Sequence, residues 1–224
     1  MGARKIISFV LKLIVVVSSF YGVFLAVSSS PDKLLFFTIQ SNIWIGVVCL
    51  VGIVMMIAKT KIRRWMYSVK LVFTVSITLT GVVYCALLAP MLGSEAYSLV
   101  SVLTHVVVPA ASVLDFAVYD YPGEYRKRVC LLATIPPFYY LGFASVGYVL
   151  NWEFNPGQNY PYFFLNWGSD AGALGFSDQP PYIGVVYYVM IMIVFVIAVG
   201  ALYILLAYIL NKIFESRSKR KRIF

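Results

Sequence analysis

Six long apolar runs constrain the fold of this chain more than any other feature of its sequence. Each has about the 20 residues that a helix needs to cross the hydrocarbon core of a bilayer. Backbone donors and acceptors inside lipid must be paired within their own segment, so these runs should be helices. The chain has 224 residues and only 12% of them are charged, which is about half the fraction in a soluble domain.

The sequence therefore predicts an all-α membrane protein, a single domain over residues 1–224 that folds as a six-transmembrane-helix bundle. Since 61% of its residues are hydrophobic, few polar residues are left for a water-facing surface, and its surroundings should be largely hydrocarbon. The predicted spans are 6–27, 34–58, 71–91, 97–118, 129–150 and 182–210.

Basic residues indicate how the spans are oriented. Of the 18 Lys and Arg residues, only Lys33 falls on a different side from the others when the spans are threaded through a membrane. The majority side includes Lys12, in the first half of the first span, and Lys70, just before the third. Because Lys and Arg concentrate in cytoplasmic loops, we expect both termini in the cytoplasm. We interpret the basic tail at 211–224 as an anchor attracted to anionic lipids, so the net charge of +9 requires no nucleic acid.

The segment 151–181, between the last two spans, is expected on the outer side. It has no Lys or Arg, and it is rich in proline, glycine, asparagine and aromatic residues. Such a composition excludes a long regular helix. The segment is expected to be either a cap over the helix ends or a partly ordered loop that aromatic side chains anchor at the membrane surface.

Polar side chains inside two of the spans are the candidate functional residues. The stretch FFTIQSN at 36–42 places Thr38, Gln40, Ser41 and Asn42 near the start of the second span, and His105, the single histidine, lies in the fourth. At 1.5 Å per residue, Thr38 is about 6 Å and His105 about 12 Å from the outer surface. These depths are compatible with one layer in the outer half of the bilayer. By helical spacing, Ser41 and Asn42 share the face of Thr38, whereas Gln40 points away.

Two further residues of the fourth span bear on this layer. Pro109 lacks an N–H, so the carbonyl of His105 loses its helical partner and the helix should be distorted there. Asp115 is about 15 Å further along the axis, too far to orient His105. We expect Asp115 to have a structural partner instead, such as a basic residue or water.

A threonine and a histidine support nucleophilic chemistry. The hydroxyl becomes a nucleophile when a neutral imidazole takes its proton. Gln40, Ser41 and Asn42 are then candidates for substrate binding or for stabilising an oxyanion. Two other readings stay open: a non-catalytic lipid-binding or carrier protein, or a structural membrane partner in which these side chains only bond between helices. The sequence has no metal-ligand spacing, phosphate-binding glycine loop or nucleotide motif, so we predict neither a metal nor another cofactor.

Four segments of the chain resemble one family. FFTIQSNIW at 36–44 is similar to the F-T-x-Q-S-N segment of the androgen-induced membrane protein family and its bacterial six-span relatives, labelled Pr6Pr. The resemblance continues in THVVVP, which contains His105, in LDF, which contains Asp115, and in YPYFFLNW from Tyr160 onward.

This resemblance implies a function. Animal members of the family are threonine hydrolases that cleave fatty acid esters of hydroxy fatty acids inside the membrane. By motif, Thr38 would be the nucleophile and His105 the general base, acting on a lipid ester in a bacterial cell membrane. The chain departs from the family at Phe116, where relatives tend to have Trp, and at Asn166, where an acidic residue is common. Both departures leave the proposed pair intact and a third catalytic residue unassigned.

Overall fold

The computed structural model describes residues 3–60, 62–118, 125 and 128–220. Helices make up its regular structure, and the described residues form no strand beyond two isolated bridges. The α-helices are α1 (Ala3–Ser29), α2 (Phe37–Ile57), α3 (Arg64–Val83), α4 (Ala89–Leu92), α5 (Leu99–Val102), α6 (Val108–Val118), α7 (Val129–Leu132), α8 (Ile135–Val149) and α9 (Val185–Arg220). Short 3₁₀ turns are η1 (Pro31–Leu35), η3 (Gly93–Tyr97) and η5 (Phe163–Leu165), and two π-helical turns are η2 (Tyr84–Leu88) and η4 (Leu103–Val107).

Six helical stretches in the described part of the chain are long and apolar enough to cross a membrane. They are Ala3–Ser29, Phe37–Ile57, Arg64–Tyr97, Leu99–Val118, Val129–Val149 and Val185–Ile213. The predicted all-α, six-helix membrane bundle is thereby confirmed. The third stretch is longer than the predicted 71–91 at both ends, because regular structure begins at Arg64 and continues through η2, α4 and η3.

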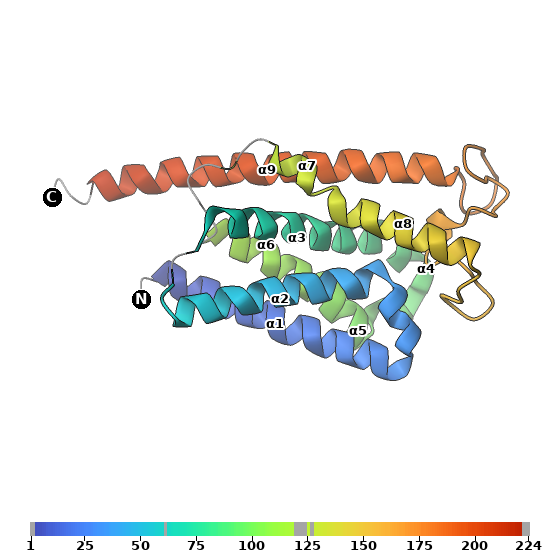
Figure 1. The fold of residues 1–224 in the computed structure, drawn as a ribbon, viewed down its shortest axis with the longest axis horizontal. Helices are drawn as coiled ribbons and strands as arrows, with labels where there is room; N and C mark the ends of the chain where they lie inside the picture. The colour runs from blue at the N-terminus through green and yellow to red at the C-terminus, as the bar shows by residue number, and fades with distance from the viewer. Residues whose placement is uncertain (1–2, 61, 119–124, 126–127, 221–224) are drawn as a thin grey trace.

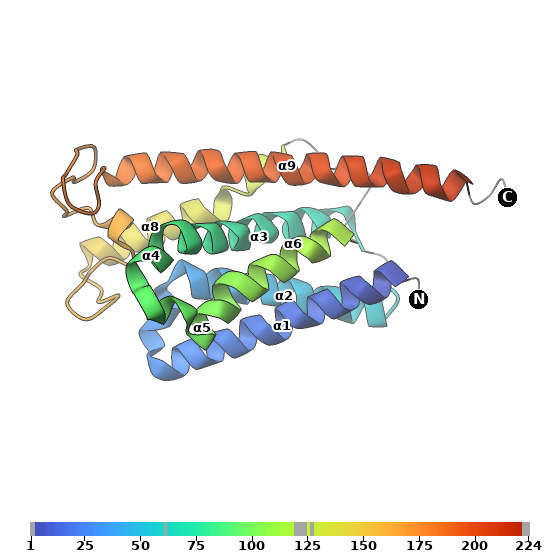
Figure 2. The ribbon, with the colours of Figure 1, turned by 180° about the vertical axis from the view of Figure 1, so that it is seen from behind.

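Helix α3 is at the centre of the bundle. It packs against α2 and α6 on one side and against α9 on the other, and α1 packs against both α2 and α6 (Figures 1 and 2). Helix α1 begins and α9 ends at the same end of the bundle, and the irregular segment between α8 and α9 lies at the opposite end, beyond these two helices (Figure 1). The helices that carry the candidate residues, α2 and the stretch α5–η4–α6, therefore belong to one compact group with α1 and α3.

Each π-helical turn ends two residues before a proline. Turn η2 ends at Leu88, before Pro90, and η4 ends at Val107, before Pro109. A proline removes the N–H that would bond the carbonyl four residues earlier. The residue just before each proline donates instead to the carbonyl five residues back, Ala89 to Tyr84 and Val108 to Leu103. The distortion expected beside His105 is therefore a π turn, a feature that is frequent at functional sites.

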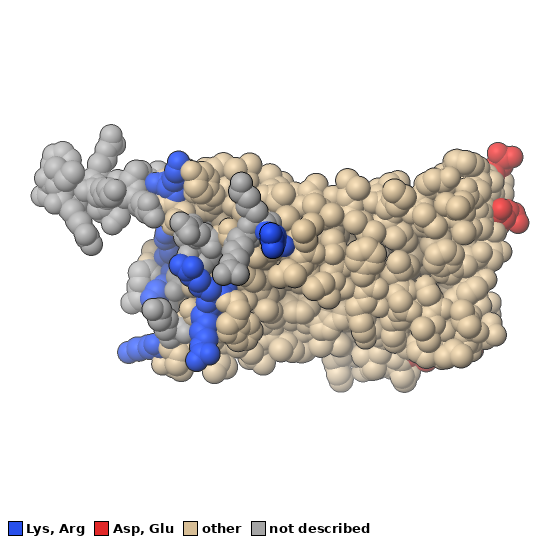
Figure 3. Space-filling model, turned by 45° about the horizontal axis from the view of Figure 1, so that its top comes forward, with Lys and Arg blue, Asp and Glu red and all other residues tan. Residues whose placement is uncertain are grey.

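Lys and Arg side chains gather at the end of the molecule where α1 begins and α9 ends (Figure 3). Several of the basic residues used to predict the orientation lie outside the described residues, namely Lys61, Arg126, Lys127, Lys221 and Arg222.

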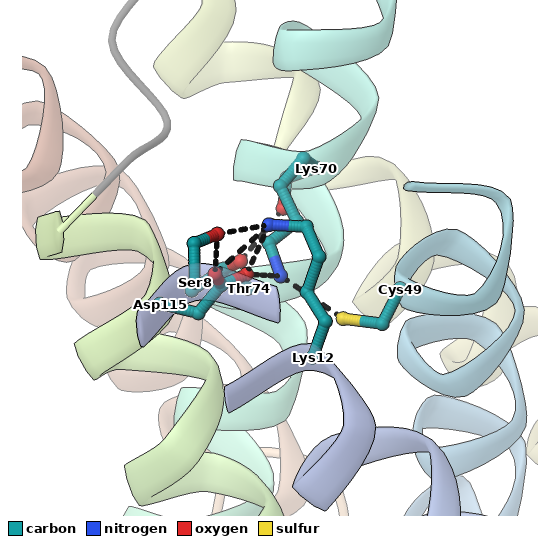
Figure 4. A network of polar contacts seen from close by, with 6 residues as sticks. All are labelled: Ser8, Lys12, Cys49, Lys70, Thr74 and Asp115. Atoms are coloured by element: carbon teal, nitrogen blue, oxygen red, sulfur yellow. Dashed lines mark hydrogen bonds and ion pairs between the residues drawn. The ribbon is translucent and has the colours of Figure 1, made fainter. Parts of the chain in front are cut away.

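Lys12 and Lys70 differ from the expectation that they would face the cytoplasm. Their side chains are buried, with 4% and 6% exposure, and both bind the fully buried carboxylate of Asp115. The Lys12 ammonium is 2.7 Å and the Lys70 ammonium 2.9 Å from Asp115 Oδ2 (Figure 4). Ser8 donates to Asp115 Oδ1 at 2.6 Å, and Lys70 donates to the sulfur of Cys49 at 3.1 Å.

These contacts connect four helices, because Ser8 and Lys12 are on α1, Cys49 on α2, Lys70 on α3 and Asp115 on α6. The prediction that Asp115 has a basic structural partner is confirmed, with two lysines in that role. Charged groups in a membrane interior are costly unless they are paired, so this buried cluster should hold the four helices in a single arrangement.

We expect Asp115→Asn to destabilise the bundle. The substitution leaves two buried ammonium groups without this carboxylate, and removing one partner of a buried ion pair costs about 3–5 kcal/mol. Thermal unfolding of the purified protein in detergent measures the change. Asp170→Asn is the control, because Asp170 is exposed and its substitution should alter stability by less than about 0.5 kcal/mol. Equal melting temperatures for the two variants would contradict a stabilising role for the cluster.

Candidate functional site

The structure brings Thr38 and His105 together. Thr38 Oγ1 is 3.2 Å from His105 Nε2, although the two residues are 67 positions apart in the chain. Both side chains are partly buried. The 3₁₀ turn Pro31–Leu35 and the extended backbone of Phe36 start α2 at Phe37, which places Thr38 in its first turn. This separation is within the range that a nucleophile and its general base require, and their catalytic roles stay a prediction.

The second ring nitrogen determines which tautomer of His105 fits the site. His105 Nδ1 is 3.1 Å from the main-chain carbonyl oxygen of Ser101, which can only accept a hydrogen bond. Nδ1 therefore carries the proton, and the unprotonated Nε2 faces the Thr38 hydroxyl as an acceptor. Thr104 Oγ1, also 3.1 Å from Nδ1, donates its own proton to the carbonyl of Val100. The geometry thus gives the imidazole the tautomer that a base needs.

An aromatic ring and a glycine hold His105 in place. The Tyr84 ring stacks on the imidazole with centroids 3.7 Å apart and planes 17° from parallel, and its hydroxyl donates to the carbonyl of Ala96 at 2.7 Å. On α3, a Cβ at Gly81 would lie 3.0 Å from the His105 carbonyl and 3.1 Å from Pro109. Gly81 therefore lets the proline-distorted part of the fourth span approach α3 closely.

The three polar neighbours of Thr38 do not face its hydroxyl. Asn42 donates to the carbonyls of Thr38 at 2.8 Å and Thr104 at 3.1 Å. Ser41 bonds the Thr38 carbonyl and the Thr80 hydroxyl, and Gln40 donates to the carbonyl of Leu34. The amide groups of Asn42 and Gln40 thus donate to main-chain oxygens. Asn42 links α2 to η4 in this way, and its amide is not available to an oxyanion.

Thr38 differs from the other threonines of the chain. Each of the others donates its hydroxyl to a main-chain carbonyl three to five residues earlier, as is common in helices; they are Thr60, Thr74, Thr78, Thr80, Thr104 and Thr134. The described contacts of the Thr38 hydroxyl are with side chains, His105 and Tyr162. The carbonyls of Leu34 and Leu35, four and three residues before Thr38, accept instead from the side chains of Gln40 and Tyr140.

Tyr162, from the irregular segment between α8 and α9, completes the contacts of Thr38. Its hydroxyl accepts from the Thr38 N–H at 3.4 Å and lies 3.5 Å from Thr38 Oγ1. Its ring stacks on Phe164, with centroids 5.1 Å apart, and contacts Phe36 edge-on. Burial raises the pKa of the Tyr162 phenol, while hydrogen bonds with Thr38, with the Tyr140 hydroxyl and with the Phe37 N–H oppose that shift.

A cavity opens beside Thr38. It contains about 670 Å³ of empty space, including the part open to the surroundings, and it lies between α3, α8, α9 and the segment that carries Tyr162. Its lining is apolar apart from Thr38, Thr80, Tyr140 and Tyr162. Phe138, one of the lining residues, is 49% exposed, so the cavity reaches the surface of the helix bundle beside α8. His105 is behind Thr38 as seen from this cavity, because the cavity lining includes the threonine and not the histidine.

Comparisons with known proteins identify no relative. No family model matches the chain, and neither a curated protein nor a solved structure matches it. The resemblance to the androgen-induced protein family therefore stays an expectation from the motifs quoted above.

Sequence reasoning missed two residues of this site, Tyr84 and Tyr162. Tyr162 belongs to the YPYFFLNW motif, which the sequence analysis singled out without assigning a role. The position of Tyr84 has a parallel with that of His105, since each is in a π turn that ends two residues before a proline. The sequence offers no shared spacing that links them, since Tyr84 is six residues before Pro90 and His105 is four before Pro109.

We expect Gly81→Val to disturb the site through packing alone. Its side chain would collide with the His105 carbonyl and Pro109, and overpacking of this kind costs about 1–3 kcal/mol. Thermal unfolding in detergent should show the loss. Gly142→Val on α8 is the matched control, because a Cβ there meets nothing within 4 Å. A Gly81→Val protein as stable as the control would show that this close approach is not required.

Proposed function

We propose that this protein is an intramembrane hydrolase that cleaves a lipid ester, with Thr38 as nucleophile and His105 as general base. The observation that carries the proposal is the bond between the Thr38 hydroxyl and the unprotonated nitrogen of the imidazole. A threonine that serves only to bond its own helix would donate to a carbonyl, as the others in this chain do. Thr38 instead faces a base on one side and an apolar cavity on the other.

The chemistry follows from this arrangement. Thr38 Oγ1 attacks the ester carbonyl carbon while its proton moves to His105 Nε2, and the carbonyl electron pair moves onto oxygen. Collapse of this intermediate expels the alcohol, which takes the proton from His105 and leaves an acyl group on Thr38. Water then attacks the acyl carbon with His105 again as base, and the fatty acid leaves as Thr38 recovers its proton.

Cavity shape and composition support a lipid as the substrate. Apolar side chains of α3, α8 and α9 would surround an acyl chain, and the partly exposed Phe138 marks a side of the cavity that faces outward. The resemblance to threonine hydrolases of the androgen-induced protein family supports the same chemistry. We further propose a bacterial cell membrane as the location, with the Lys- and Arg-rich end of the bundle in the cytoplasm, by the positive-inside rule.

We expect the purified wild-type protein to hydrolyse p-nitrophenyl decanoate and to be labelled by an alkyl fluorophosphonate. Thr38→Ala should abolish both, because it removes the attacking oxygen. His105→Ala should slow both by about 10²–10⁴-fold, the usual contribution of a general base. Released p-nitrophenol and in-gel detection of the label measure the two reactions.

Thr78→Ala is the matched control, since it removes a threonine hydroxyl of α3 that bonds a carbonyl and Tyr203 away from the cavity. Its hydrolysis rate should equal that of wild type. Full hydrolysis by Thr38→Ala would end the assignment. Binding of the ester without turnover by wild type would favour a lipid-binding or carrier protein instead.

A further inference from the structure

The Tyr162 hydroxyl is placed where charge would develop during attack by Thr38. It lies 3.5 Å from the attacking oxygen and lines the cavity in which an ester would lie. In a tetrahedral intermediate the oxyanion is attached to the same carbon as Thr38 Oγ1. A donor a few ångströms from the attacking oxygen, on the cavity side, can therefore reach the oxyanion.

The bond from Thr38 leaves the phenol proton for a partner on the cavity side. Tyr140, another cavity residue, bonds the Tyr162 hydroxyl and gives its own proton to the Leu35 carbonyl at 3.0 Å, so an oxyanion would take the place of Tyr140 as acceptor. The Thr38 N–H donates to the Tyr162 oxygen, so that bond uses the oxygen as acceptor and not the proton. The N–H groups of the first turn of α2 are at the positive end of a helix of 21 residues. A phenol that accepts from such a group becomes a stronger donor. Because burial raises its pKa, Tyr162 also keeps its proton at neutral pH.

The amide side chains predicted to stabilise an oxyanion donate to main-chain carbonyls instead. Asn42 uses its amide hydrogens on two carbonyls and is fully buried, and Gln40 donates to Leu34. Among the described residues, Tyr162 is the polar donor that contacts Thr38 Oγ1 from the cavity.

We propose that Tyr162 is a catalytic residue, whose hydroxyl donates a hydrogen bond to the oxyanion formed when Thr38 attacks the ester carbonyl. This inference rests on the proposed hydrolase function. During attack the Oγ1–carbon bond forms, the carbonyl pair moves onto oxygen and the Thr38 proton moves to His105. Tyr162 keeps its proton throughout and shares it with the oxyanion. The irregular segment between α8 and α9 thereby supplies part of the active site.

The test compares Tyr162→Phe with wild type in hydrolysis of p-nitrophenyl decanoate. Losing one oxyanion donor should lower kcat by about 10²–10³-fold and leave KM nearly unchanged. A second readout uses two inhibitors, a trifluoromethyl ketone with a decyl chain and the methyl ketone with the same chain. Thr38 adds to the former to give an oxyanion, whereas the latter stays a neutral ketone. Tyr162→Phe should weaken inhibition by the trifluoromethyl ketone in parallel with kcat/KM, and leave the methyl ketone unaffected.

Tyr187→Phe is the control variant. Its hydroxyl donates to the carbonyl of Leu174, so the substitution removes a phenol bond to the same irregular segment away from Thr38. It should hydrolyse the ester at the wild-type rate. Tyr162→Phe with a wild-type kcat, or with equal losses for both ketones, would overturn the role of Tyr162. In either case an inactive Thr38→Ala would leave the hydrolase proposal standing, whereas an active Thr38→Ala would remove both.

Discussion

Polar groups inside a bilayer must bond to one another, and this constraint underlies the whole arrangement of the protein. Water cannot solvate them there, so most hydroxyl, amide and charged groups of the spans are placed where another part of the chain can pair with them. Among the described residues, the Ser112 hydroxyl and the Asn42 side-chain oxygen are buried exceptions with no hydrogen-bond partner. Threonines and serines of α3 meet the requirement locally, by donating to carbonyls of the preceding turn. Asp115 meets it across helices, with Lys12 and Lys70. Thr38 meets it with the imidazole of His105.

The two polar clusters occupy opposite parts of the same helix group. The Asp115 cluster (Figure 4) includes Ser8 and Lys12 from the first half of α1, which begins at the end where the basic side chains gather. The Thr38–His105 contact joins the first turn of α2 to η4, and α2 begins toward the opposite end of the bundle (Figure 1). Helices that are joined at one end have little freedom to shift at the other. We interpret the lysine–aspartate cluster as a support that keeps α2 and the fourth span in register, so that a 3.2 Å contact can persist without a covalent connection.

Much of the fold could be predicted because apolar length and helical rise are properties of single segments. The depths of Thr38 and His105 follow from counting residues, which is why their shared layer could be foreseen. Rotation of a helix about its own axis depends on all its neighbours, and this is where prediction was incomplete. The sequence places Lys12 and Lys70 on the cytoplasmic side and makes Asn42 a candidate for substrate binding or an oxyanion, because nothing in their own segments shows that the lysines face Asp115 or that Asn42 faces two carbonyls. The contact of Tyr162 with Thr38 could not be predicted for another reason. Tyr162 lies in an irregular segment, and such a segment has no periodicity that indicates the path of its backbone.

The π turns at Tyr84 and His105 have a consequence for how this site arose. Such a turn holds one residue more than the α-helix around it, so its presence is equivalent to a single insertion that the helix absorbed. Deleting one residue from η4 would restore the ordinary winding and rotate the preceding part of the span by about 100° relative to the remainder. Alignments with distant homologues should accordingly carry one-residue gaps just ahead of Pro90 and Pro109. Homologues with such gaps would present a different side chain to the threonine, and would have lost the stacked tyrosine together with the imidazole.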